Sequence, residues 1–280
     1  MNYKNYLLGI ACILFMTTCN KDYPNPDTND CQDVIWAEGV YNDASSIMDE
    51  AAGSGRLPLY CDVQTPQDLS ACASIQYYHA NITDPDTIVV DFGSSDCLCS
   101  DNRYRRGQIL AIISTPSLFY FDSIVTNGIK IQFNGYYVND NQVQGTKTIS
   151  CLGRNSTTHN YNFKSTVAGS ITNRSGQTMT WNTTENKELQ NNLYFTDWYN
   201  AIYYITSSGG ATGSGFNSSN YSSTIVSPLI VSGNCSYITT GVMSVTPEGA
   251  TTRTVNFGAG ACDRAINVTI DGNQYNINQQ

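Results

Sequence analysis

The sequence predicts an all-β protein, an antiparallel β-sandwich or a curled multi-stranded sheet, preceded by one N-terminal helix. Three observations carry this prediction. From about residue 73 onward apolar and polar residues alternate with a period of two, which is typical of strands with one buried face. Turn-forming Gly, Asn, Asp and Ser separate the alternating runs. One phrase also occurs twice, as IVVDFGSSDC at 88–97 and as RTVNFGAGAC at 253–262.

The first thirty residues indicate export. An apolar run at 7–16 follows Lys4 and is too short to span a bilayer as a helix, so we interpret 1–18 as a secretory signal peptide. Cys19 comes directly after this segment and resembles the lipidated cysteine of bacterial lipoproteins. An ordinary signal peptide with a nearby cysteine is the alternative. Residues 19–31, which include this cysteine, are interpreted as a flexible tether because they are rich in Asp, Asn and Pro.

One helix is expected at 33–52, where apolar residues are spread among good helix formers before Gly53. Asp49 and Glu50, near its end, are interpreted as part of a solvated face. The chain from 32 to 280 contains no linker long enough to require two domains, so we expect a single helix-plus-β domain.

The alternating runs after the helix predict a series of short strands. Asp271-Gly272 lies between two of these runs and is the strongest hairpin signal in the chain. The expected strands include 87–92, 107–113, 128–138, 144–150, 160–164, 170–172, 177–182, 201–206, 224–231, 268–270 and 275–277.

The cysteines favour disulfide bonds over a metal site. Cys12 would leave with the signal peptide and Cys19 would carry lipid, which leaves eight of the ten in an exported chain. An even number in such a chain is typical of a disulfide framework. Cys97 and Cys99 are one residue apart, too close for half of a zinc site. We therefore expect neither a metal nor a cofactor.

The repeated phrase predicts two of the disulfides. Each copy ends in a cysteine, and each is preceded by Cys-x-x-Ile at the start of the expected hairpin. A hairpin brings its two ends together, as a disulfide requires. The predicted pairs are therefore Cys72–Cys97 and Cys235–Cys262. For the four other cysteines, which allow three arrangements, we expect Cys31–Cys61 and Cys99–Cys151, with the alternatives left open.

The shared Phe-Gly of the two copies has a structural interpretation. Phe92 and Phe257 are expected to fill the core at the end of a strand. Gly93 and Gly258 are expected to permit the turn that follows, because glycine adopts positive φ without steric cost. The phrase is therefore assigned to architecture and not to catalysis.

The charge of the chain argues against nucleic acid as a partner. The formal net charge is −9, and a nucleic-acid site requires a basic patch that neutralises phosphates. Arg103, Arg105 and Arg106 form the one basic cluster, which we interpret as a solvated strand end.

The sequence contains no recognisable catalytic constellation, so the chain is not expected to be an enzyme. His79 lies in an expected strand and His159 in a polar loop, and neither adjoins a nucleophile motif. A pair of distant carboxylates could still be assembled by folding. A glycan-acting hydrolase is therefore kept as the second alternative function.

A run of aromatic residues suggests a binding surface. Residues 193–204 include Trp198 and Tyr199, and Trp181 precedes them. Aromatic side chains exposed beside Asn and Asp can stack on sugar rings, so these three are the candidate ligand-binding residues of a carbohydrate-binding surface lipoprotein, the first alternative function. The other interpretation is that alternate residues of the run fill the core.

Several segments together resemble one known group of proteins. They cover nearly the whole chain: the lipobox at Cys19 and the following helix, TIVVDFG at 87–93, RGQI at 106–109, FNGYYVNDNQVQGTKT at 133–148, MTWNTT at 179–184, CSYI at 235–238, VTP at 245–247 and the stretch from Phe257 to Gly272. These segments are similar to those of hypothetical lipoproteins common in Bacteroidota, especially flavobacteria, for which no activity is established.

The resemblance implies a compartment and a topology, and it implies no functional residues. It suggests a lipid-anchored protein of the cell envelope, at the periplasmic face of the outer membrane or at the cell surface. Asp86-Thr87-Ile88 and Asp122-Ser123-Ile124 also resemble the O-glycosylation signal of exported Bacteroidota proteins, with Thr87 and Ser123 as acceptors. Strand starts are an equal alternative for both.

The sequence thus favours a cell-envelope lipoprotein with a non-catalytic structural or interaction role. Its expected partners are the lipid bilayer, through acylated Cys19, and a glycan or an envelope protein. Three structural observations would separate the functions. Exposed aromatics clustered on one face would favour a glycan binder, convergent carboxylates in a deep pocket would favour a hydrolase, and a polar surface with an open strand edge would favour assembly.

Overall fold

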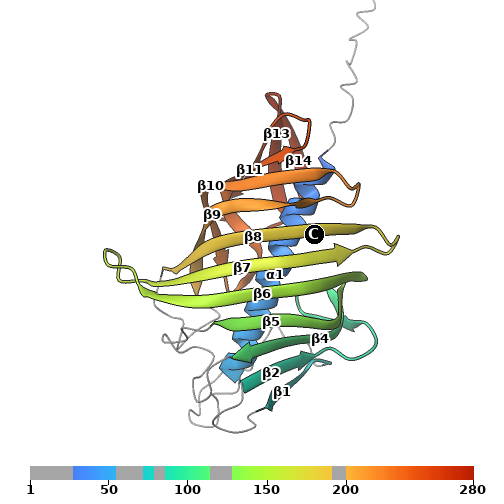
Figure 1. Cartoon of the computed structure of the whole chain (residues 1–280), viewed down its shortest axis with the longest axis vertical. Coiled ribbons are helices and arrows are strands. Elements are labelled where there is room, and N and C mark those ends of the chain that lie inside the picture. The colour runs from blue at the N-terminus through green and yellow to red at the C-terminus, as the bar shows by residue number, and fades with distance from the viewer. Residues whose placement is uncertain (1–27, 55–71, 79–85, 114–127, 191–199) are drawn as a thin grey trace, which may run out of the picture.

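The protein consists of one helix and one continuous antiparallel sheet (Figure 1). The computed structural model describes residues 28–54, 72–78, 86–113, 128–190 and 200–280. The elements are α1 (Asn29–Ser54), β1 (Ser74–Tyr78), β2 (Asp86–Asp91), β3 (Cys97–Leu98), β4 (Tyr104–Ile113), β5 (Ile129–Val138), β6 (Asn141–Arg154), β7 (Tyr161–Thr172), β8 (Thr178–Leu189), β9 (Ile202–Ser214), β10 (Asn220–Ser232), β11 (Cys235–Pro247), β12 (Arg253–Ala259), β13 (Ala265–Ile270) and β14 (Asn273–Asn278).

The strands pair almost entirely in chain order. The order in the sheet runs from β1 through β2 and β4 to β14, and β3 pairs with β4 beside this path. Each pairing is antiparallel, and β1 and β14 stand at the two ends without being joined to each other. The prediction of one helix followed by an antiparallel all-β sheet is confirmed, in the form of a curled sheet and not of a sandwich.

The helix α1 runs across the strands on the inner side of the curl (Figure 1). It contacts β2, β4, β8 and β11. Most of its residues are buried, including Val34, Ala37, Tyr41 and Met48. A stripe of polar or small residues, Gln32, Gly39, Asp43 and Ser46, is half-buried or exposed. The apolar side of α1 therefore packs against the inner face of the curl.

The helix begins earlier than the sequence predicted. It starts at Asn29, so residues 29–31, expected in the tether, belong to the helix, and Cys31 is buried. The reason lies in tertiary contacts at its first turn. Asp30 accepts a hydrogen bond from Arg253, and Asp33 accepts one from the backbone N–H of Phe216. These contacts hold residues 29–31 in the helix, although their polar composition alone predicted a flexible tether.

The end of the helix also differs from expectation. Glu50 is buried, whereas the sequence placed it with Asp49 on a solvated face. Glu50 thus faces protein, whereas Asp49 is half-buried and Ser46 is exposed. Among the described residues, no helix combines the length and the apolar character that crossing a membrane requires.

Both copies of the repeated phrase are closed by a disulfide, as predicted, but Gly93 follows β2 whereas Gly258 lies within β12 and not in a turn after it. The disulfides Cys72–Cys97 and Cys235–Cys262 are both present. Phe92 and Phe257 are each 2% exposed and belong to the core. Gly93 and Gly258 adopt φ of 83° and 94°. The predicted hairpin at Asp271-Gly272 joins β13 to β14. The disulfides indicate an extracytoplasmic protein.

The prediction of a Cys99–Cys151 disulfide is wrong. Both cysteines are free: the thiol of Cys99 donates to the carbonyl of Cys97, and the sulfur of Cys151 accepts from the N–H of Gly153. Cys99 follows β3 and Cys151 lies in β6, and β4 and β5 separate these strands. At about 4.8 Å per strand, their Cα atoms cannot come within the roughly 7 Å that a disulfide allows. Cys61, the expected partner of Cys31, lies outside the described residues.

Candidate functional site

The aromatic residues proposed for ligand binding do not form a surface in the described part of the chain. Trp181 is 1% exposed, which corrects its assignment as a ligand-binding residue. It points inward from β8 and packs near Tyr221, with ring centroids 6.2 Å apart. Its cross-strand neighbours are Gly169 and Gly213, and the Tyr41 hydroxyl occupies the space over Gly169. Trp198 and Tyr199 lie outside the described residues.

The exposed aromatic side chains that the structure describes are dispersed. Tyr77 and Tyr78 lie on β1, Tyr104 begins β4 and Tyr204 lies on β9. Tyr77 turns toward the helix and donates a hydrogen bond to the carbonyl of Ala51. The expected signature of a glycan binder, aromatics gathered on one face, is therefore absent from the described residues.

The predicted modification sites fall partly outside the described structure. Cys19 and Ser123 lie outside it. Thr87 lies in β2, where it is half-buried and paired with Tyr78 on one side and Ile112 on the other. The lipidation and O-glycosylation of these residues stay predictions.

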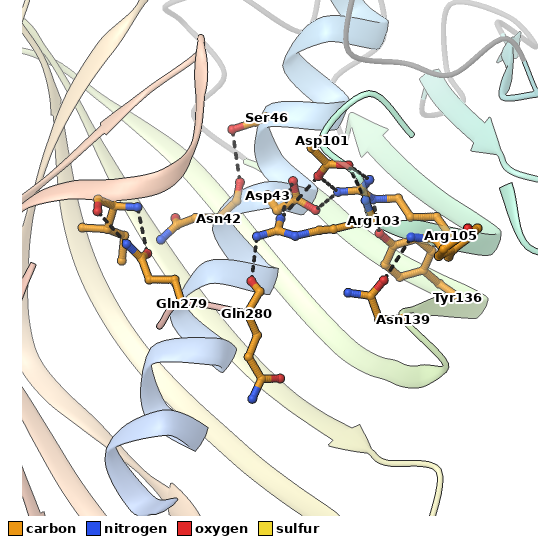
Figure 2. A network of polar contacts seen from close by, with 12 residues as sticks. Asn42, Asp43, Ser46, Asp101, Arg103, Arg105, Tyr136, Asn139, Gln279 and Gln280 are labelled. Atoms are coloured by element: carbon orange, nitrogen blue, oxygen red, sulfur yellow. Dashed lines mark hydrogen bonds and ion pairs between the residues drawn. The ribbon is translucent and has the colours of Figure 1, made fainter. Parts of the chain in front are cut away.

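The basic cluster is not a solvated strand end, which corrects that interpretation. Arg105 is 3% exposed and Arg103 is 6% exposed. Arg105 forms a bidentate contact with Asp101, at 2.7 and 2.6 Å, and its Nη2 lies 2.7 Å from Oδ2 of Asp43 on α1 (Figure 2). Its Nε donates to the hydroxyl of Tyr136 on β5 at 3.2 Å. Arg106 is the member that reaches solvent, where it pairs with Asp96 and Asp140.

We refer to Asp43, Asp101, Arg103, Arg105 and Tyr136 as the arginine network. Arg103 extends it to the C-terminal segment, because its Nη2 donates to the carbonyl oxygen of Gln280 at 2.8 Å (Figure 2). Burial by itself would raise the pKa of Asp101, but the hydrogen bond from Arg105 and the charges of both arginines outweigh it and lower that pKa. The charges of the network are thus satisfied within the protein.

A small cavity adjoins the arginine network. It measures about 60 Å³, between α1, the turn before β4 and the start of β11. Ligand pockets typically measure about 300–1,000 Å³, so this cavity accommodates a few water molecules and not a sugar ring. Its polar lining comes from Asn42, Asp43, Ser46, Glu50, Asp101, Arg105, Ser232, Ser236 and Tyr237. Of the charged groups, Asp43, Asp101 and Arg105 are already paired with one another.

A second polar group lies deeper, between α1 and the strands β6 and β8. We refer to Glu38, Asn42, Lys147, Glu185 and Lys187 as the core cluster, and all five are buried. Glu38 and Asn42 are one helical turn apart, and Nδ2 of Asn42 donates to Oε1 of Glu38 at 2.6 Å. Nζ of Lys147 donates to Oδ1 of Asn42 at 3.1 Å and to the backbone carbonyl of Tyr41 at 2.9 Å. One asparagine amide thus lies between a carboxyl group and an amine.

Burial sets the protonation of this cluster. It raises the pKa of Glu38 well above its usual value, and the charge of Glu185 and a hydrogen bond with it raise it further. Burial, reinforced by the charge of Lys187, lowers the pKa of Lys147 to about 7. Lys147 has no carboxylate within ion-pair distance among the described residues. The interior therefore favours a protonated Glu38, and near neutral pH a substantial fraction of Lys147 is the neutral amine.

One unsatisfied atom supports the same protonation state. Oε2 of Glu38 is buried and, within the described structure, accepts no hydrogen bond. An ionised carboxylate in that position would be costly. A protonated carboxyl group at Glu38 avoids this cost, in keeping with its raised pKa.

Sequence reasoning missed both polar groups, although the strands carried a signal for the core cluster. In β8, Trp181, Glu185 and Lys187 occupy alternate positions that point inward, and all three are buried. In β6, Lys147 likewise points to the same side of the sheet as the buried Val143. A charged residue at an inward position of a strand predicts a buried charge. The helical members of the cluster gave no comparable signal.

The chain was also compared with known proteins. Neither the protein-family models nor the curated proteins nor the solved structures gave a match.

Proposed function

We propose that this protein is a cell-envelope lipoprotein with a non-catalytic structural or interaction role, anchored in the outer membrane through an acylated Cys19. The location in the cell envelope is inferred from the resemblance to the hypothetical lipoproteins of Bacteroidota. The disulfides support the extracytoplasmic part of it.

The observation that carries the non-catalytic role is the position of α1. The helix lies on the inner side of the curled sheet (Figure 1), and most of its side chains are buried there. A curled sheet that binds a small molecule or a glycan in its interior needs that space empty. Here the interior is filled with side chains of the protein itself.

The outer surface supports an interaction role. Outward positions on neighbouring strands carry hydroxyl and amide side chains, with cross-strand pairs such as Thr172–Thr178 and Thr166–Thr184. At the far end of the sheet, β14 carries Asn, Gln, Tyr and Ile and no charged side chain. Edge strands of soluble proteins are commonly protected by charges, so an uncharged edge favours contact with another protein.

A single assay separates the three functions considered for the chain. The purified protein from Asn20 onward is incubated with a glycan array and with insoluble polysaccharides, and both bound protein and released reducing ends are measured. We expect neither binding nor release. Release of reducing ends would replace the proposal with a hydrolase. Binding that Trp198→Ala or Tyr199→Ala weakens would replace it with a carbohydrate-binding protein.

The anchor is tested separately. The full chain and its Cys19→Ala variant are expressed in a bacterium that processes lipoproteins, and the membrane and soluble fractions are compared. We expect the full chain in the membrane fraction and the variant in the soluble fraction. Equal distribution of the two would rule out acylation of Cys19.

A further inference from the structure

We propose that Lys147 and Asn42 join through an intramolecular isopeptide bond, with Glu38 transferring the proton, so that α1 becomes covalently linked to β6. This inference rests on the geometry of the core cluster and is independent of the envelope function proposed above.

The nucleophile and the group it attacks are already in contact. Nζ of Lys147 lies 3.1 Å from Oδ1 of Asn42. The side-chain carbon Cγ of Asn42 is bonded to that oxygen, so the amine is hydrogen-bonded to the carbonyl group that it would attack. A second hydrogen bond, to the carbonyl of Tyr41 at 2.9 Å, fixes the position of Nζ. Two groups held in contact by a folded protein react far faster than the same groups free in solution.

The interior also makes the amine reactive. An ammonium group has no lone pair, and a lysine becomes nucleophilic when burial removes its proton. Burial and the charge of Lys187 lower the pKa of Lys147 to about 7. Lys187 itself is not an equivalent nucleophile, because its Nζ lies 4.7 Å from the ring centroid of Tyr203, and no hydrogen bond joins it to a side-chain amide among the described residues.

Glu38 is positioned to act on the leaving group. Its Oε1 lies 2.6 Å from Nδ2 of Asn42, which is the atom that must depart. At this distance the protonated carboxyl group can donate its proton to the departing nitrogen, and the carboxylate that remains then accepts the proton that the attacking amine loses. The neighbouring Glu185 helps to keep Glu38 protonated, and Thr183 donates to Glu185 at 3.3 Å.

The reaction balances without any added reagent. The bond between Nζ of Lys147 and Cγ of Asn42 forms, and the bond between Cγ and Nδ2 of Asn42 breaks. One proton moves from Nζ through Glu38 to Nδ2, and ammonia leaves. No atom is oxidised or reduced, and Glu38 ends in its starting state. Lys147 and Glu38 are buried, and the amine held at Oδ1 of Asn42 has the advantage of proximity over water in the small cavity that Asn42 borders.

The test is mass spectrometry of the folded wild-type protein. After reduction of the disulfides, we expect an intact mass lower than that of the sequence by one ammonia. A succinimide at Asn134-Gly135 would give the same loss, so tryptic digestion is decisive. The expected product is a branched peptide in which the segment containing Asn42 is joined to the segment containing Lys147.

Variants separate the roles of the three residues. Lys147→Met and Asn42→Ala each remove a bond-forming group and are expected to give the full mass. Glu38→Gln keeps both bond-forming groups and the packing, and it should lower the rate of bond formation at least 100-fold, since positioned proton transfer contributes about 10²–10⁴ in rate. Lys164→Ala, at an exposed lysine of β7, is the matched control and should retain the branched peptide.

The outcome that overturns the proposal needs no variant. If folded wild-type protein with both disulfides intact yields separate peptides containing Asn42 and Lys147, the bond does not form. A branched peptide in wild type that persists undiminished in Glu38→Gln would keep the bond and remove Glu38 from its formation.

Discussion

The guanidinium Nη2 of Arg105 lies 2.7 Å from Oδ2 of Asp43, and this ion pair joins β4 to the helix inside the curl. It lies beside the cavity at the start of β11, where the C-terminal Gln280 also contacts Arg103. The arginine network therefore connects the helix, the first half of the sheet and the end of the chain. Contacts of this kind fix the orientation of α1 inside the sheet. Apolar packing alone would not do so, because it has little directionality.

Removing one partner of this pair should strongly destabilise the fold. Asp43→Ala leaves the buried Arg105 with less compensation, and breaking a buried ion pair in this way costs about 3–5 kcal/mol. We expect the midpoint of urea unfolding to fall accordingly. Arg174→Ala removes a pair whose arginine is largely exposed, and it should cost about 0–1 kcal/mol. Equal effects of the two substitutions would contradict a buried role for Asp43.

The stability should depend on Asp101 at acid pH. Its folded-state pKa is lowered, so the folded protein binds its proton less readily than the unfolded chain. The stabilisation is present above the ordinary Asp pKa of about 4 and is lost as the pH falls through the folded-state value. Urea unfolding measured between neutral and acid pH should show this loss, and Asp101→Asn should reduce its slope. An unchanged slope in the variant would show that Asp101 does not contribute.

Two glycines should respond in opposite ways to alanine. A Cβ at Gly169 on β7 would lie 1.9 Å from the hydroxyl of Tyr41, which donates to the carbonyl of Gln144. Gly169→Ala should therefore displace Tyr41 and cost about 1–3 kcal/mol. A Cβ at Gly39 on α1 meets no atom within 4 Å. Gly39→Ala should stabilise the helix by about 0.5–1 kcal/mol, and thermal unfolding of both variants checks the signs.

The isopeptide bond should contribute to stability as a long-range cross-link. Lys147 and Asn42 are 105 residues apart in the chain, and a cross-link that closes a loop of about 100 residues contributes about 4–5 kcal/mol in the chain-entropy model. Freshly folded Glu38→Gln protein that lacks the bond should therefore unfold at lower urea concentration than wild type. If wild type carries the bond but unfolds at the same urea concentration as Glu38→Gln, the bond does not constrain the unfolded chain.

The local features of this protein were readable from its sequence. The alternating runs predicted strands because each strand has one buried face. The Asp271-Gly272 turn predicted a hairpin because both residues accept positive φ, and they adopt φ of 48° and 81°. The paired cysteines of the repeated phrase predicted two disulfides because a hairpin brings its own ends together. Each of these inferences depends on residues close in the chain or joined by one hairpin.

The tertiary structure alone decided what lies inside the curl. The sequence did not show that the sheet wraps around α1, so Glu50 and Arg105 were expected in solvent and Trp181 at the surface. It also gave no sign that Asn42 meets Lys147, since that contact depends on how the sheet curves around the helix. Strand periodicity specifies which residues of a strand point inward. The partner that each of them meets depends on the curvature of the sheet and the position of the helix, and both arise from the packing of the whole chain.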